Sequence, residues 1–269
     1  MANRANIQKR RFEILDTLLK WEGELSNSRI RDLLDIQVVS ASRLLADYRE
    51  AYPDRLSWDS SRKRYLLRPN RERFGGAADD YLRLLTEQGE QLNWIERLDT
   101  NISVVQPAVL STIRRAIQDE KLVQIDYASM THPEGQTRDI FPFHIVEAGR
   151  RWHVRAWCCM RGEYRDFVLG RIRSIKESLD VMRPSIPDTG WETRADVRLV
   201  PHSALSPAQA RVIRDELLDG TTARRIRTRA CLVPYVVQEV RASVSIDQQP
   251  PDYQIEVANL DEIRLYLFP

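Results

Sequence analysis

Seven polar side chains between residues 127 and 171 could together bind a ligand that carries phosphate. Three of them are arginines, and a planar guanidinium group can hold a phosphate through two hydrogen bonds. Tyrosine and histidine can stack on a base or donate a hydrogen bond to an oxyanion. We therefore expect a pocket for a nucleotide or a nucleic-acid end, lined by Tyr127, Ser129, His144, His153, Arg155, Arg165 and Arg171.

Each of these residues also has an ordinary structural interpretation. Tyr127 could be a strand residue with its hydroxyl group at the surface, and His144 and His153 could be solvated strand residues. In the same region, Arg138 could pair with Asp126 or Asp139, and the large apolar side chains favour a core. No nucleophile or metal cluster accompanies the histidines, so we do not expect an enzyme.

The elements that must position this pocket are short segments in which apolar and polar residues alternate. Such alternation predicts strands, and the breaks at residues 133–135, 148–149 and 161–162 predict the turns between them. The sequence therefore predicts a small all-β unit with strands at 123–127, 138–145, 151–158, 165–169 and 172–175.

The third of these strands has two different faces. Trp152, Val154, Ala156 and Cys158 fall on one face, which can pack against a core. Arg151, His153, Arg155 and Trp157 fall on the other. We expect this second, polar face to bind a partner.

Four motifs in this region resemble the WYL domain found in many bacterial transcription regulators. They are I-x-Y at 125–127, R-x-I-x-P at 138–142, R-W-x-V-x-A at 151–156 and R-x-F-x-L-x-R-I at 165–172. The triplet that names the domain reads Trp152-His153-Val154 here, and the forms R-W-H-V-R-A and R-D-F-V-L-x-R-I are closer to the BrxR and CapW group of repressors beside phage-defence operons. The resemblance implies an SH3-like β-barrel that senses a nucleic-acid ligand, with Arg165 and Arg171 involved.

The first 73 residues have a pattern typical of a helix-turn-helix. Helical periodicity predicts a first helix over 6–21, a second that begins after a cap at Ser26 or Asn27, and a third over 38–50. In the third helix, apolar side chains repeat at i, i+3, i+4 and i+7, which predicts that Ala41, Leu44, Leu45 and Tyr48 are buried.

The remaining surface of the third helix suits DNA recognition, although an ordinary amphipathic helix has a polar face as well. Arg43 can reach the O6 and N7 atoms of guanine in the major groove. We expect DNA contacts from Gln37, Ser40, Ser42 and Arg43.

A basic hairpin follows these helices. Leu56 and Trp58 alternate before the turn at 59–61, and Tyr65 and Leu67 alternate after it. A hairpin after a helix-turn-helix indicates a winged helix, and this segment also resembles the winged helix of the same regulator group. We expect Arg62, Lys63 and Arg64 to contact backbone phosphates or the minor groove.

Charge is distributed unevenly along the chain. Residues 1–73 hold 16 Lys and Arg against 11 Asp and Glu, and residues 121–176 hold 10 against 6. These two segments are the candidates for anionic partners. The three cysteines have no metal-binding spacing, and we expect reduced thiols, no metal and no cofactor. With no apolar run long enough to span a membrane and no signal core, we expect a cytoplasmic protein without a membrane partner.

These observations predict a multi-domain α+β protein. We expect a winged helix DNA-binding domain at 1–73, a helical connector at 74–120, the WYL domain at 121–178 and a small α+β extension at 179–269. Segment 231–241 could be a helix or a strand. In the connector, one helix would include residues 81–98 and another would follow Pro107, and such helices commonly pair across a twofold axis.

The expected function is sequence-specific DNA binding by a homodimer that regulates transcription from an inverted-repeat operator. An effector in the WYL pocket would modulate this binding, and the resemblance implies repression of a phage-defence operon. The alternative is an accessory module that recognises single strands or ends through the WYL face and uses its winged helix only as an anchor.

Overall fold

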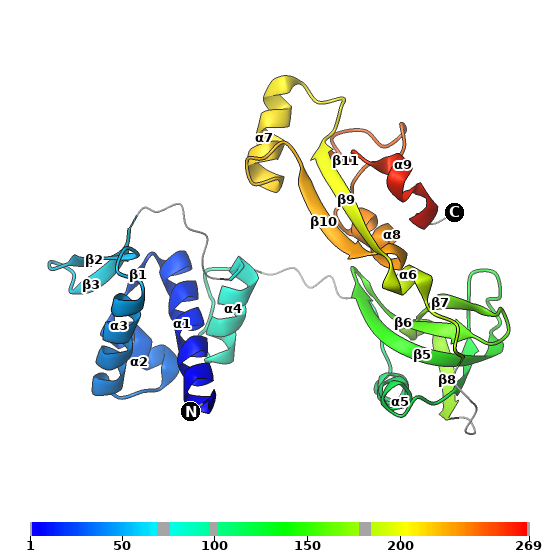
Figure 1. The fold of residues 1–269 in the computed structure, drawn as a ribbon, viewed down its shortest axis with the longest axis horizontal. Helices are drawn as coiled ribbons and strands as arrows, with labels where there is room; N and C mark the ends of the chain where they lie inside the picture. The colour runs from blue at the N-terminus through cyan, green and yellow to red at the C-terminus, as the bar shows by residue number, and fades with distance from the viewer. Residues whose placement is uncertain (1, 69–75, 97–101, 178–183, 268–269) are drawn as a thin grey trace. The chain divides into compact units, whose positions relative to one another are not determined.

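The computed structural model describes residues 2–68, 76–96, 102–177 and 184–267. The chain divides into two compact units, residues 1–98 and 99–269 (Figure 1). The expected domain boundaries at residues 73 and 178 lie outside the described residues, as does Leu98.

The first unit contains the predicted winged helix-turn-helix. Helices α1 (Ala2–Glu22), α2 (Asn27–Leu34) and α3 (Val38–Ala51) are followed by the hairpin of β2 (Leu56–Asp59) and β3 (Arg64–Leu67). A two-residue strand, β1 (Glu24–Leu25), pairs with β3. The hydroxyl of Ser26 accepts a hydrogen bond from the backbone N–H of Arg29 at 3.1 Å, which confirms the predicted cap of α2.

Only the first helix of the expected connector lies in this unit. Helix α4 (Ala78–Glu87) packs against α1, and its Leu85 lies in the winged helix core. The helix does not continue through Leu92 and Ile95 as the periodicity predicted. Gly89 has a positive φ of 78°, and the backbone N–H of Glu90 donates to the carbonyl of Leu85, which is the left-handed cap that ends a helix.

The second unit is built on a five-stranded antiparallel sheet with the order β7-β6-β5-β4-β8. The strands are β4 (Val123–Tyr127), β5 (Gln136–Ala148), β6 (Arg151–Cys158), β7 (Glu163–Val168) and β8 (Ile172–Glu177). All five predicted strands are present. In the described residues, the edge strands β7 and β8 are not paired with each other, so the closed barrel that the resemblance implies is not confirmed.

Helix α5 (Pro107–Gln118), the second helix of the expected connector, covers one face of this sheet. Its Val109 and Ile113 belong to the same buried core as Val154 and Ala156 of β6. Alternation along β6 therefore places the predicted apolar face in the core. Arg138 of β5 is buried and donates to Gln136 at 3.0 Å, instead of pairing with Asp126 or Asp139.

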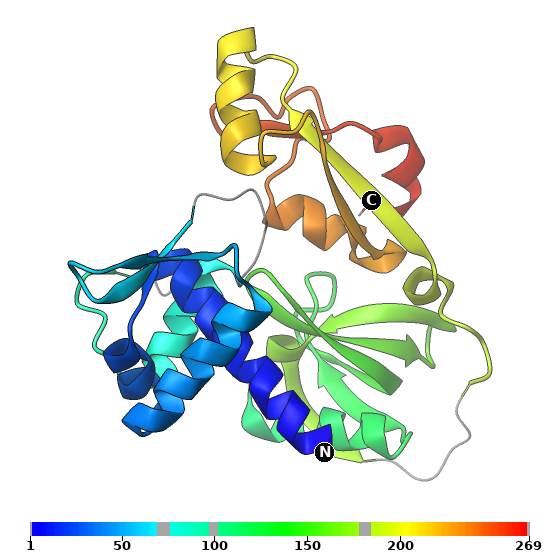
Figure 2. The ribbon, with the colours of Figure 1, turned by 60° about the vertical axis from the view of Figure 1, so that its left-hand side comes forward.

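The remaining elements are α6 (Thr189–Glu192), β9 (Arg194–Pro201), α7 (Pro207–Leu217), β10 (Arg224–Arg229), α8 (Val233–Glu239), β11 (Ile255–Val257) and α9 (Leu260–Ile263). They form a small α+β region around the sheet β10-β9-β11. Helix α8 fills the segment that the sequence left open, after a 3-10 turn at Ala230–Leu232. It contacts both β5 and β9, and Figure 2 shows it between the two sheets. No helix in the described parts of the chain combines the length and apolar character needed to cross a membrane.

Candidate nucleic-acid interface and ligand pocket

Helix α3 buries one stripe of side chains and exposes the opposite face. Ala41, Leu44, Leu45 and Tyr48 are all at most 7% exposed, as predicted. The four residues expected to contact DNA, Gln37, Ser40, Ser42 and Arg43, are exposed.

These side chains differ in whether they already have a hydrogen-bond or ion-pair partner within the chain. Gln37 stands at the N-cap of α3 and makes no side-chain capping bond. Ser42 accepts a hydrogen bond from the side chain of Asn27 at 2.8 Å, which ties α3 to α2. Among the described residues, Arg43 has neither an ion-pair nor a hydrogen-bond partner, so its guanidinium group is available to an external acceptor.

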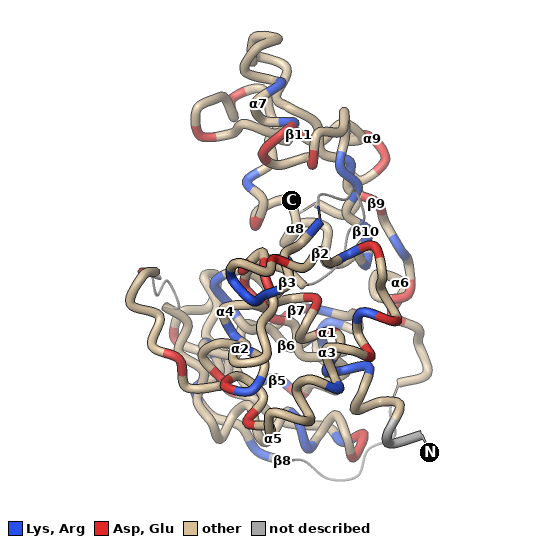
Figure 3. Tube along the Cα trace, turned by 90° about the vertical axis from the view of Figure 1, so that its left-hand side faces the viewer, with Lys and Arg blue, Asp and Glu red and all other residues tan. Residues whose placement is uncertain are grey.

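The hairpin of β2 and β3 carries three cations at and beside its turn, Arg62, Lys63 and Arg64. Figure 3 marks the Lys and Arg positions along the chain. The carboxylate of Asp59 accepts hydrogen bonds from the hydroxyl of Ser61 and the backbone N–H of Arg62, and these bonds lower its pKa. Lys63 adopts a positive φ of 52° at the exposed turn. Arg64 pairs with Glu24 of β1, so Arg62 and Lys63 are the more exposed cations of the three.

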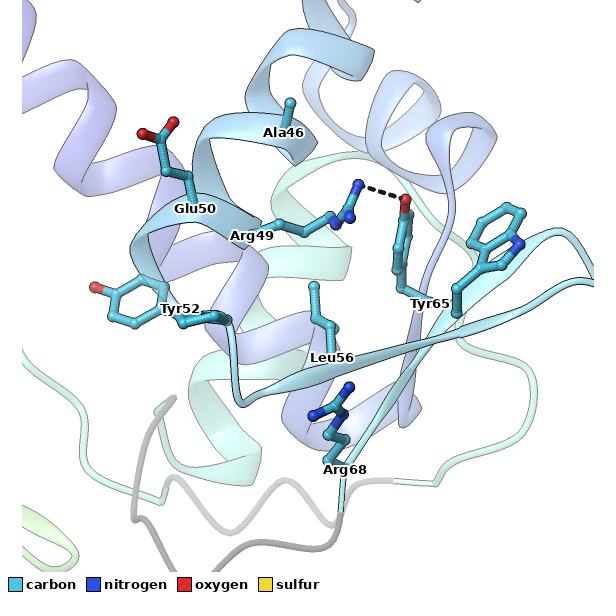
Figure 4. Close-up of a pocket in the computed structure, with 9 residues that line it drawn as sticks. Ala46, Arg49, Glu50, Tyr52, Leu56, Tyr65 and Arg68 are labelled. Carbon is cyan, nitrogen blue, oxygen red and sulfur yellow. Dashed lines mark hydrogen bonds between the residues drawn. The ribbon is translucent and has the colours of Figure 1, made fainter.

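A cation–aromatic contact fixes the hairpin against α3 (Figure 4). Arg49 of α3 donates to the hydroxyl of Tyr65 at 2.8 Å, and its guanidinium carbon lies 4.8 Å from the centre of the Tyr65 ring. Tyr65 in turn contacts Trp58 on the opposite strand, with 4.7 Å between ring centres. Arg49 was not predicted to have a role. Its position seven residues after Ser42 on an exposed face was the available signal.

The second candidate site is a cavity of about 440 Å³ between the five-stranded sheet and α8. Three of the seven residues predicted to bind a ligand line it: Tyr127, His153 and Arg171. Arg150 from the turn between β5 and β6 and Arg151 at the start of β6 add positive charge, whereas Asp166 and Glu239 add negative charge. A cavity with clustered guanidinium groups and a tyrosine can accept an anionic ligand.

Arg155 lies beside this cavity but is already paired. Its guanidinium donates to Asp166 of β7 at 3.1 Å and to both carboxylate oxygens of Asp188 at 2.7 and 2.9 Å. Tyr235 of α8 donates to the other oxygen of Asp166 at 2.9 Å. Burial disfavours the charge on Arg155, but Asp188 and Asp166 outweigh this effect and raise its pKa. The polar face of β6 therefore binds the chain's own C-terminal region.

His153 is also buried, with 5% of its surface exposed. Burial lowers its pKa, and the positive charges of Arg151 and Arg171 act in the same direction against the opposing charge of Asp166. Its ring lies 4.9 Å from the ring of Tyr235. Its Nδ1 atom has no hydrogen-bond partner within the described structure.

The other predicted ligand residues lie outside the cavity. His144 stacks on Trp191 of α6 with 3.9 Å between ring centres. Ser129 accepts a hydrogen bond from the backbone N–H of His132 in the loop after β4. Arg165 is 46% exposed and pairs with Glu163 at 3.5 Å. Because side chains alternate along β7, Arg165 lies on the face opposite to Asp166.

Tyr235, Asp166 and Glu239 were not identified as part of the pocket. Tyr235 and Glu239 lie on α8, in the segment whose secondary structure the sequence left open. The carboxylate of Glu239 lies so close to Gly149 that a Cβ atom there would be 2.3 Å from it. Gly149 also has a positive φ of 54°. A glycine at this turn was the only local signal of a close contact.

A winged helix-turn-helix together with a separate domain that holds a ligand-sized cavity is typical of transcription regulators with a sensor domain. Family comparisons agree region by region. Residues 8–87 match the BrxR transcriptional regulator winged helix-turn-helix domain, residues 108–177 match the WYL domain, and residues 194–263 match the BrxR transcriptional regulator C-terminal dimerization domain.

Relatives cover almost the whole chain. The chain is 31% identical to the DNA-binding transcriptional repressor CapW of Escherichia coli (strain KTE188), over 95% of this chain and 90% of that protein. It is 30% identical to CapW of Pseudomonas aeruginosa, over 96% and 91%. A solved structure of proteasome accessory factor B/C of Arthrobacter aurescens matches with a TM-score of 0.28 and 18% identity, over 62% of this chain and 27% of that chain, which is too weak to support an argument. The chain belongs to the family of WYL-domain transcriptional regulators that includes CapW and BrxR.

The buried ion pair predicts the first mutational result. We expect Arg155→Ala to destabilise the second unit by about 3–5 kcal/mol, because it leaves the carboxylates of Asp166 and Asp188 buried without a cation. Arg165→Ala, which removes an exposed pair, should cost about 0–1 kcal/mol. Urea unfolding of the two full-length variants measures both values. Equal losses in the two variants would contradict a structural role for the Arg155 network.

The lowered pKa of His153 predicts a pH dependence. The folded chain resists protonation at this histidine, whereas the unfolded chain binds the proton below a pH of about 6.5. We therefore expect this group to reduce stability as the pH falls below about 6.5 and to have no effect above it. Urea midpoints at pH 7.5 and 5.5 should differ less in His153→Gln than in the wild type. His132→Gln, at an exposed loop position, is the control and should retain the wild-type difference.

Proposed function

We propose that this chain is a DNA-binding transcriptional repressor that acts as a homodimer. The observation that carries the proposal is the exposed face of α3, where Arg43 is exposed and has no partner among the described residues. The exposed cations Arg62 and Lys63 on the adjacent wing suit contacts to the DNA backbone. The match to CapW repressors over most of the chain supports the same function.

The proposed dimer forms through the C-terminal region. Residues 194–263 match a domain described as a dimerization domain, whereas the helical pattern of 74–120 suggested that those helices pair. In the structure, α4 and α5 each pack into the core of a different unit. A symmetric dimer would present two copies of α3, and such a pair suits an inverted-repeat operator with half-sites about one helical turn apart or a multiple of it.

We assign effector binding to the cavity between the sheet and α8. Arg171, Arg151 and His153 suit a phosphate. The hydroxyl group of Tyr127 accepts a hydrogen bond from the backbone N–H of Val168 and can donate one to an oxyanion. A nucleotide or nucleic-acid effector there would change the population of the DNA-binding state. The likeness to the BrxR and CapW group supports a phage-defence operon as the regulated target.

DNA recognition is tested by fluorescence anisotropy of the full-length protein at near-physiological salt. We expect a preference of roughly a thousandfold for a duplex from upstream of its own gene over a scrambled duplex. Arg43→Ala should weaken operator binding by about 1–3 kcal/mol and relax preference at one position, because a bidentate contact to guanine is lost. Lys63→Ala should weaken both duplexes alike, because it removes a backbone contact.

Two outcomes would refute this assignment. Equal effects of Arg43→Ala on operator and scrambled duplex would remove Arg43 from base recognition. A wild-type protein that binds single strands as well as the upstream duplex, with an affinity that collapses as salt rises, would favour the accessory module instead.

The effector site is tested with a short single-stranded DNA that carries a 5′ phosphate. We expect this probe to change operator affinity of the wild type, and Arg171→Ala to bind the operator normally but to lose the response. Arg165→Ala is the matched control, because Arg165 lies on the face of β7 opposite to Asp166 and does not line the cavity. If the control loses the response and Arg171→Ala retains it, the ligand binds elsewhere on the sheet.

A further inference from the structure

The recognition helix carries two exposed valines in its first turn. Val38 is 51% exposed and Val39 is 79% exposed, although both are β-branched apolar residues. Isolated exposed apolar residues are common on protein surfaces. The position of Val39, however, lies on the face of α3 that the proposed function directs toward DNA.

Helical geometry places Val39 opposite the buried stripe. At about 100° per residue, Val39, Arg43 and Ala46 lie on one line, at i, i+4 and i+7. All three are exposed. The buried residues Ala41, Leu44, Leu45 and Tyr48 occupy the other side of the helix. The most outward ridge of α3 therefore begins with a branched apolar side chain, followed by an arginine and then a small residue that leaves space.

Three polar side chains beside this ridge already have partners within the first unit. Ser42 is bonded to Asn27, and Asp47 accepts a hydrogen bond from Gln8 of α1 at 3.3 Å. Arg49 is bonded to Tyr65 of the wing. Val39 and Arg43 lie on the outward ridge at the N-terminal end of α3, with the exposed Gln37 and Ser40 beside them. This is the end of a recognition helix that contacts base edges.

Each base pair presents a different pattern of hydrogen-bond donors and acceptors in the major groove. The C5-methyl group of thymine is the apolar group in that groove. We propose that Val39 contacts the methyl group of a thymine in each operator half-site and thereby determines specificity at that position. The inference rests on the proposed function, because it requires α3 to lie in the major groove. Charge complementarity supports DNA as the occupant of this surface, since Arg43 lies on the same ridge and the wing carries Arg62 and Lys63.

The geometry also limits where this thymine lies. Residues four apart on a helix are separated by about 6 Å along its axis, and base pairs by about 3.4 Å. Long side chains on a helix lean toward its N-terminus, so the Arg43 side chain extends toward Val39. The thymine contacted by Val39 is therefore expected within about two base pairs of the guanine contacted by Arg43.

The test replaces each operator thymine, one at a time, by deoxyuridine, which lacks only the methyl group. Anisotropy with the full-length wild type should show one thymine per half-site where the replacement weakens binding about fourfold, the value of one buried methyl group. Val39→Ala should lose a similar factor on the thymine operator and should be insensitive to deoxyuridine at that position. Because Val39 is exposed, this variant is expected to fold normally. Val104→Ala, at a valine that is 77% exposed in the other unit, is the matched control and should behave as the wild type.

Three results would overturn the inference. They are a wild type insensitive to deoxyuridine at every position, a Val39→Ala variant with the same sensitivity profile as the wild type, and a Val39→Ala loss that is equal on operator and scrambled duplex. The proposed function fails separately, if the wild type shows no preference for the upstream duplex. If the wild type shows that preference and Arg43→Ala loses it while the deoxyuridine scan is flat, only the role of Val39 is rejected.

Discussion

The buried guanidinium of Arg155 is the contact on which the second unit depends. It is 8% exposed, and it joins β6 to Asp166 of β7 and to Asp188 at the start of the C-terminal region. A buried cation is tolerated only when its charge and hydrogen-bond donors are matched, which two carboxylates achieve here. The position of the C-terminal region on the sheet is therefore fixed by a specific charge arrangement as well as by apolar packing.

Asp166 connects this ion pair to the cavity between the five-stranded sheet and α8. One of its oxygens accepts from Arg155, and the other accepts from Tyr235 of α8. The same Tyr235 lines the cavity together with His153 and Arg171. A ligand that displaces Tyr235 would leave Asp166 with one partner fewer in a region of low solvent access. This shared carboxylate therefore links the proposed effector cavity to α8, which belongs to the region that matches a dimerization domain.

The local elements were predictable because their signals are local. Alternation located β4 to β8, and helical spacing identified the buried stripe of α3. Contacts between distant segments were not predictable in this way. The polar face of β6 was expected to meet an external partner, yet Asp188 and Tyr235, more than thirty residues further along the chain, cover it. Similarly, the motif that contains Arg165 and Arg171 does not show that the two arginines lie in different environments, because that depends on strand alternation and on the 3-10 turn at Leu169–Arg171.

The same limit applies to charge. The excess of basic residues in 121–176 suggested an anion-binding surface, but many of these cations have partners within the chain. Arg155 is neutralised by a carboxylate from outside the segment, Arg165 pairs with Glu163, and Arg173 donates to the carbonyl groups of Pro133 and Glu134. In the winged helix, by contrast, Arg43 has no partner among the described residues, and Lys63 is exposed at the turn of the hairpin. A count of charges along the sequence measures composition, whereas attraction for a polyanion depends on the cations that the fold leaves unneutralised. By that measure, the α3 and wing surface is the stronger candidate for DNA, and the cavity beside Arg171 suits a small anionic group.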